Sequence, residues 1–181
     1  MQDRPLLLGL LLTATAAALP TTNPPALKGL AEADLAVNLK QAPLNLRFSA
    51  GQQMRLAYSR CAKGPYGGNM LDVCYDRLDG KIVMVNATVF GRDAASGREF
   101  LSYLASMPIQ GVSPAAARAW VEKTYPLIRE GRPAEKLFGS VKFELSGNNR
   151  GAMFLQVLHK DWGRTRLGTV DCAKPKSAAG T

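Results

Sequence analysis

The sequence predicts an α+β domain in which two hairpins build an antiparallel sheet and two helices pack on one face of it. Stretches of alternating apolar and polar residues lie on either side of turn-forming residues, a pattern typical of β-hairpins. Between these stretches, apolar residues recur at helical spacing in two segments, each of which begins with a capping residue. Strands, helices and strands follow one another, and this order favours helices packed on an antiparallel sheet.

The first strands are predicted at residues 54–59, 72–77 and 81–90. Asp79 and Gly80 separate the last two and form a favoured two-residue hairpin turn. One face of the third strand is apolar and carries Val83, Val85, Ala87 and Val89. Its other face mixes polar and apolar residues, so we expect a central strand of the sheet that is covered on both sides.

Two helices are predicted next. Ser96 and Glu99 have the spacing of a capping box, and an apolar stripe follows them. Ser113 is a good N-cap for the second helix, and Pro114 suits its first position. A shorter helix is expected within residues 27–39. The predicted buried faces contain Phe100, Leu101, Leu104 and Met107 in the first helix, and Ala117, Trp120 and Val121 in the second.

The second hairpin is predicted at residues 141–145 and 152–159, joined by a turn at 146–151. In the first of these strands Lys142 and Glu144 lie on the predicted solvent-exposed face. The apolar faces carry Val141, Phe143 and Leu145 in one strand, and Met153, Leu155 and Val157 in the other.

The N-terminus predicts export. Arg4 precedes an apolar stretch from Leu6 to Leu19, which is too short to span a bilayer, and Ala16 and Ala18 are small residues of the kind found at a cleavage site. A buried N-terminal helix is the alternative. We expect a cleaved signal peptide, after which no transmembrane segment remains, and a periplasmic or secreted protein. The expected organisation is a signal peptide at 1–18, a flexible leader at 19–29, one domain at 30–172 and a disordered tail at 173–181.

The chain is basic, with 23 Lys and Arg against 14 Asp and Glu, a net charge of +9. Such a surplus favours polyanionic partners, namely a cell-wall polymer, anionic lipid or nucleic acid, although solubility alone would also account for it. Lys160, Arg164 and Arg166 surround Trp162, so this segment is a candidate for binding a polyanion or another partner. Packing of Trp162 at the sheet edge is the competing interpretation.

The cysteines at positions 61 and 74 flank a glycine-rich segment, so we expect a disulfide between Cys61 and Cys74 that closes a long hairpin loop. Cys172 is either free, joined to another molecule or paired with one of these two. No cofactor or metal is expected, because no C-x-x-C spacing occurs and three separated cysteines with one histidine do not form the usual zinc cluster.

His159 is the only histidine, and Glu144 belongs to the partner strand of its hairpin. A nuclease-like hydrolase would use His159 as general acid and Glu144 as general base, whereas a lone histidine at a strand end more often has no catalytic role. The sequence contains no nucleophile elbow, phosphate-binding loop, metalloprotease helix or calcium-binding loop. The sequence therefore predicts an exported binding module, either associated with the envelope or secreted, without a complete catalytic set. A small secreted hydrolase acting on a polyanion is one alternative, and a secreted inhibitor or adaptor that offers its sheet to a protein partner, such as an envelope protein, is another.

Overall fold

The computed structural model describes residues 22–49, 51–54, 56–128 and 132–167. The predicted signal peptide, the tail and Cys172 lie outside the described residues. Within the described part of the chain, no helix has both the length and the apolar character needed to cross a bilayer.

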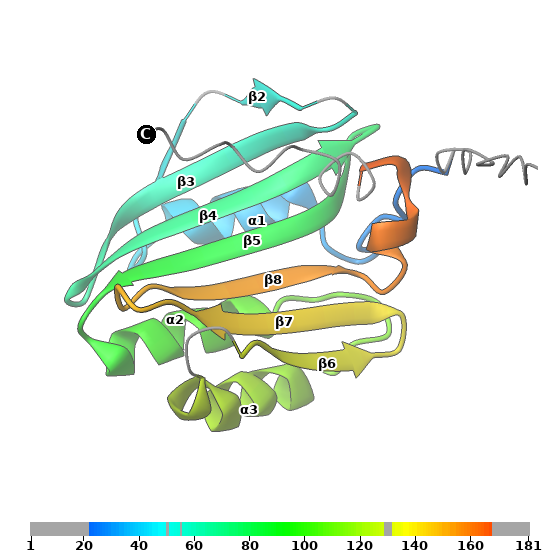
Figure 1. The fold of residues 1–181 in the computed structure, drawn as a ribbon. Coiled ribbons are helices and arrows are strands. Elements are labelled where there is room, and N and C mark those ends of the chain that lie inside the picture. The colour runs from blue at the N-terminus through cyan, green and yellow to red at the C-terminus, as the bar shows by residue number, and fades with distance from the viewer. Residues whose placement is uncertain (1–21, 50, 55, 129–131, 168–181) are drawn as a thin grey trace, which may run out of the picture.

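The described residues confirm the α+β class, with an eight-stranded sheet in which every pairing is antiparallel. Its order is β1-β3-β4-β5-β8-β7-β6, with β2 paired to β3 (Figure 1). Two three-stranded meanders, β3–β5 and β6–β8, therefore meet where β5 pairs with β8. The strands are β1 Arg47–Phe48, β2 Gln52–Gln53, β3 Tyr58–Tyr66, β4 Asn69–Leu78, β5 Lys81–Gly91, β6 Ala134–Phe138, β7 Val141–Gly147 and β8 Met153–His159.

Three α-helices occur in the described residues: α1 Glu32–Lys40, α2 Ala94–Ala105 and α3 Pro114–Thr124. The predicted start of α3 is confirmed, since the Ser113 side chain accepts a hydrogen bond from the backbone of Ala116. The predicted capping box of α2 is wrong. Asp93 caps this helix, and its carboxylate accepts from the backbone N–H groups of Ala95 and Ser96, so the helix begins earlier than expected.

The main core lies between one face of the sheet and the three helices, and Figure 1 shows α1 behind the strands of the first meander. Alternate residues of the long strands β4, β5, β7 and β8 point into it, as the period of two requires. Val85, Ala87 and Val89 do so in β5, as predicted. Val83 does not share their face, because the pairing of β4 and β5 shifts register between Asp76 and Arg77. Val83 therefore belongs to a smaller cluster.

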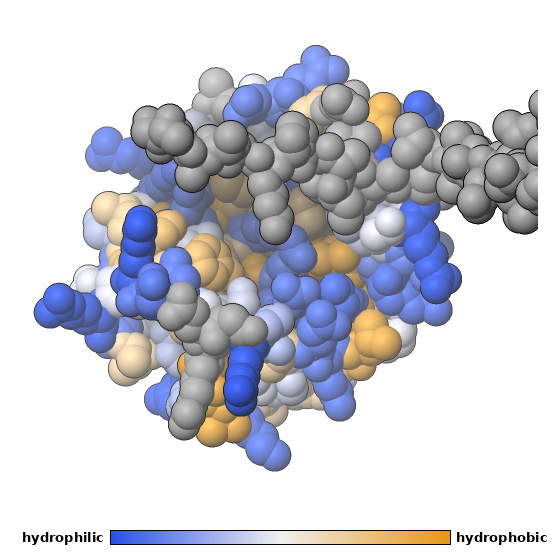
Figure 2. Space-filling view, in the orientation of Figure 1, coloured by the Kyte–Doolittle hydropathy of each residue, from blue (hydrophilic) through white to orange (hydrophobic). Residues whose placement is uncertain are grey.

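The opposite face of the sheet, called the open face below, is covered at one end by the 3-10 helix η2, Trp162–Arg164, and the residues next to it. Figure 2, which looks onto this face, shows hydrophilic and hydrophobic side chains intermixed across it. A row of opposed open-face positions crosses six strands and contains Cys61, Cys74, Asn86, Gln156, Glu144 and Glu135. The apolar cluster at the covered end contains Ala57, Val83, Met84, Leu158, Trp162 and Leu167.

The hairpin of β3 and β4 corrects two sequence predictions. The strand expected at 54–59 begins only at Tyr58, and the glycine-rich segment between the cysteines continues the two strands. The pairing runs without a break to Tyr66 opposite Asn69, so a turn of two residues, Gly67 and Gly68, joins the strands. Gly64 lies close to Leu46 inside β3, because a Cβ at this position would be 3.0 Å from the Leu46 side chain, which would have to shift to make room.

Candidate functional site

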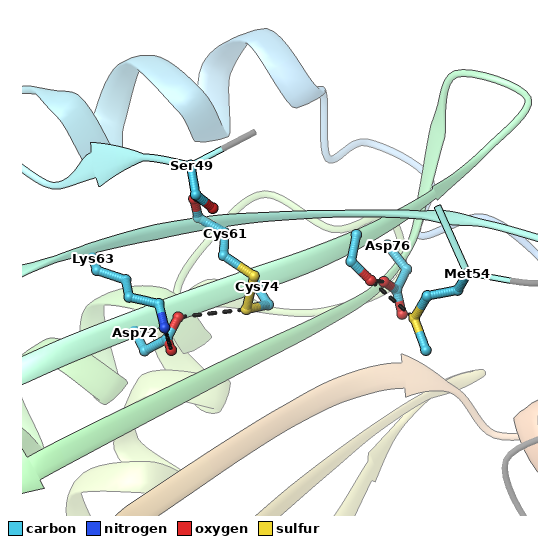
Figure 3. Close-up of a disulfide and its surroundings, with 8 residues drawn as sticks. Ser49, Met54, Cys61, Lys63, Asp72, Cys74 and Asp76 are labelled. Atoms are coloured by element: carbon cyan, nitrogen blue, oxygen red, sulfur yellow. Dashed lines mark hydrogen bonds and ion pairs between the residues drawn. A yellow bond between two sulfur atoms is a disulfide. The ribbon is translucent and has the colours of Figure 1, made fainter. Parts of the chain in front are cut away.

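The predicted disulfide is confirmed, and it joins residues that lie directly opposite each other. Cys61 in β3 pairs with Cys74 in β4, and their Cα atoms are 4.1 Å apart. Both side chains point to the open face and are half-buried (Figure 3). The bridge therefore fastens the middle of a regular hairpin, whereas the sequence had predicted that it closes a loop.

The two candidate catalytic residues do not lie together. His159 is opposite Val141 and points to the helix-covered face, whereas Glu144 is opposite Gln156 and points to the open face. The Glu144 carboxylate lies 3.1 Å from the ammonium group of Lys142. The alternation in the sequence already indicated this separation. It places Glu144 on the solvent-exposed face of its strand, and it places His159 on the same face as the apolar Val157.

The structure holds the His159 ring in a defined state at the end of β8. Its side chain is 17% exposed, and its Nδ1 atom accepts a hydrogen bond of 3.2 Å from the backbone N–H of Asp161. The Asp161 carboxylate lies 3.6 Å from the same nitrogen. In the neutral imidazole the proton is therefore on Nε2, which becomes a hydrogen-bond donor. An N–H donor at Nε2 suits the binding of an anionic ligand, whereas the predicted general-acid role lacks its partner base because Glu144 points to the open face.

His159 lines a pocket of about 360 Å³ that is built by segments distant in sequence. The backbone N–H of Leu27 donates to the carbonyl of Ile82 at 2.8 Å, and that of Gln110 donates to the carbonyl of Lys28 at 2.7 Å. These bonds hold the second part of the predicted leader between β5 and the segment that joins α2 to α3, where Leu27 is buried. The lining residues are Pro25, Ala26, Lys28, Gln110, Ser140, Val141 and His159.

The lining of this pocket, called the His159 pocket below, favours an anionic group. Lys28 supplies a positive charge, and His159 and Gln110 carry side-chain N–H donors. None of the described residues that line it carries a carboxylate. Charged donors bind carboxylate and phosphate oxygens more strongly than neutral donors do, so an anion is the ligand that this donor set fits best.

The predicted polyanion-binding residues lie just beyond β8, next to the same end of the sheet. Lys160 and Arg166 are exposed, and the Arg164 side chain is 88% exposed, 3.8 Å from the Asp161 carboxylate. Trp162 is only 9% exposed and packs in the apolar cluster on the open face. Its ring is therefore a packing element and offers no stacking surface.

The chain matches no family model, no curated protein and no solved structure. Lys28 and Gln110 were not found from the sequence, because backbone bonds between distant segments bring them to His159 and no local motif marks them.

A second pocket, of about 210 Å³, lies where the end of α1 approaches α2. Its lining includes the carboxylate of Glu99 and the ring of Tyr66. Burial, followed by the hydrogen bond and charge of Glu99, raises the pKa of Tyr66. Because none of the described residues that line this pocket carries a positive charge, it suits an anion less well than the His159 pocket does.

Proposed function

We propose that this protein is an exported binding module that holds an anionic group of an envelope polymer in the His159 pocket. The observation that carries the proposal is the pocket itself, in which Lys28 and His159 face a cavity without a lining carboxylate. The net charge of +9 supports a polyanion as the partner. Export is supported by the predicted signal peptide and by the disulfide, since such bonds persist in oxidising compartments.

Lys160, Arg164 and Arg166 extend the positive surface beyond the pocket. Exposed cations of this kind contact successive charges of a polymer and release its condensed counterions, so binding weakens as salt rises. The pocket then provides the selective contact, and the exposed residues provide attraction that depends on salt.

The test is a titration of the full-length mature chain with three probes: a poly(glycerol phosphate) oligomer, a short RNA and vesicles containing phosphatidylglycerol. Lys28→Met should weaken binding by about tenfold, because it removes a charge-assisted contact. Lys123→Met removes one exposed charge from α3 and is the matched control, expected to change affinity by less than twofold.

The same titrations at two salt concentrations test the outer residues. Replacing Arg164 and Arg166 by Ala should weaken binding and reduce its salt dependence. Equal affinity of the Lys28→Met and Lys123→Met variants would contradict the His159 pocket as the binding site. Binding to none of the three probes would contradict the proposal that the protein binds a polyanion. Turnover of the RNA that disappears in His159→Ala contradicts a role limited to binding.

A further inference from the structure

The disulfide has a third potential ligand beside it. The donor atoms of Cys61, Cys74 and Asp72 all lie within 4.8 Å of one another, and the three residues are half-buried on the open face. Asp72 precedes Cys74 by two positions in β4, so strand geometry places both side chains on the same face. The neighbourhood of the bridge therefore combines two sulfurs with one carboxylate (Figure 3).

The Asp72 carboxylate is held in a suitable orientation. Its Oδ2 atom lies 2.8 Å from the Nζ atom of Lys63, the residue opposite it in β3. Its Oδ1 atom lies 3.4 Å from the Sγ atom of Cys74. One oxygen is thus anchored by an ion pair, while the other faces the sulfurs.

Reduction would convert this group into a ligand set. A dithiol reductant delivers two electrons and two protons to the bridge, giving two Cys thiols, and is itself oxidised to a disulfide. On binding a divalent ion the two thiols become thiolates and release their protons. Two thiolates with one carboxylate match the ligand preferences of Zn²⁺ and of the softer Cd²⁺.

The backbone already has the spacing that such a site needs. In tetrahedral coordination with Zn–S bonds of about 2.3 Å, the two sulfurs lie about 3.8 Å apart. Cys61 and Cys74 have Cα atoms 4.1 Å apart, so their side chains stand side by side and, once the bridge is reduced, their sulfurs would have to move apart to reach that separation. We propose that the reduced protein binds one Zn²⁺ through Cys61, Cys74 and Asp72, with water as the fourth ligand, and that the disulfide form does not.

This site is independent of the His159 pocket, and its test uses the full chain with Cys172→Ser so that only the two cysteines of the bridge remain. The protein is reduced with dithiothreitol, which is then removed anaerobically, and circular dichroism checks that the fold persists. Zn²⁺ is titrated in competition with a chromophoric chelator, and Cd²⁺ is followed by its thiolate charge-transfer absorption. We expect one ion per reduced chain and none for the oxidised chain.

Asp72→Asn should weaken Zn²⁺ binding by about tenfold or more, since loss of even an outer-shell partner costs that much. Asp79→Asn changes an exposed carboxylate in the β4–β5 turn and should leave the affinity unchanged. An unfolded dithiol would bind metal without any dependence on Asp72, so equal affinity of the two variants overturns the proposal. Uptake by the oxidised chain, or none by the reduced chain, overturns it as well.

Discussion

Glu32, the first residue of α1, joins this helix to the first meander. Its carboxylate accepts hydrogen bonds from Arg77 at 2.9 Å, from Tyr75 at 3.1 Å and from Arg60 at 3.2 Å. Burial opposes ionisation of Glu32, but the hydrogen bonds from Arg77, Tyr75 and Arg60, together with the charge of Arg77, outweigh it and lower the pKa of this carboxyl. The ionised form is therefore the one that stabilises the fold.

Glu32→Gln keeps the size of the side chain and removes its charge. A hydrogen bond to a charged group contributes about 1.5–3 kcal/mol when it is shielded from water. The Arg60 and Arg77 side chains are 34% and 29% exposed, so solvent screens these pairs and the low end of that range applies. We expect the free energy of unfolding to fall by about 2 kcal/mol and the melting temperature by about 4–8 °C. Asp34→Asn, in the same helical turn, is the control and should cost less than about 1 kcal/mol.

The pH dependence provides a second measurement. Because the pKa of Glu32 is lower in the folded chain, its contribution is complete above the ordinary value of 4.5 and is lost as the pH falls through the folded value. Urea unfolding at about pH 7 and about pH 3 should show a smaller difference between Glu32→Gln and the parent chain at the lower pH. A cost below about 0.5 kcal/mol, or a difference that is the same at both pH values, refutes the reasoning.

Replacing Cys61 and Cys74 by Ser should lower the free energy of unfolding by about 3 kcal/mol, the loop-entropy value for a separation of 13 residues. Peptide mapping without reduction checks the pairing, and either residue linked to the third cysteine would contradict it. Burial, followed by the negative charge of Glu32, raises the pKa of Tyr75 to about 12. The stability that the neutral Tyr75 side chain contributes is therefore complete below pH 10 and is lost as the pH rises through the folded value. Tyr75→Phe should therefore flatten the alkaline loss of stability in urea titrations, and an unchanged slope argues against this cause. Gly67→Ala should cost at least about 1 kcal/mol more than Gly80→Ala in urea unfolding, because both glycines have positive φ but only a Cβ at Gly67 would overlap a hydroxyl of α2. Equal costs would show that the turn adjusts freely.

Local signals predicted the elements that depend on local chemistry. The Asp79-Gly80 turn and the Ser113 cap form as expected because a short stretch of backbone determines each of them. β6 was missed because it is a short strand with mostly exposed side chains, among them Leu137, and it lacks the alternation of a half-buried strand. The register shift that moves Val83 to the other cluster depends on how β4 pairs with β5, which composition does not reveal.

The candidate site was predicted only in part for a related reason. His159 and the three exposed cations after it were found because they are close in sequence. Lys28 and Gln110 reach the same pocket through hydrogen bonds between segments that no motif connects. Trp162 appeared available for stacking because charged residues surround it in sequence, yet the chain after β8 turns its ring into an apolar cluster.

The junction of β5 with β8 determines when this sheet can be completed. Gln156 and Asn86 share a side-chain hydrogen bond there although they are 70 residues apart in the chain, whereas each meander forms from neighbouring strands. The meanders are therefore favoured to form early, and closing the long intervening loop delays their union. Until β8 arrives, β5 presents a long unpaired edge that can recruit a strand from another chain. During biosynthesis the chain is thus most prone to aggregate after β5 has emerged and before β8 has followed it.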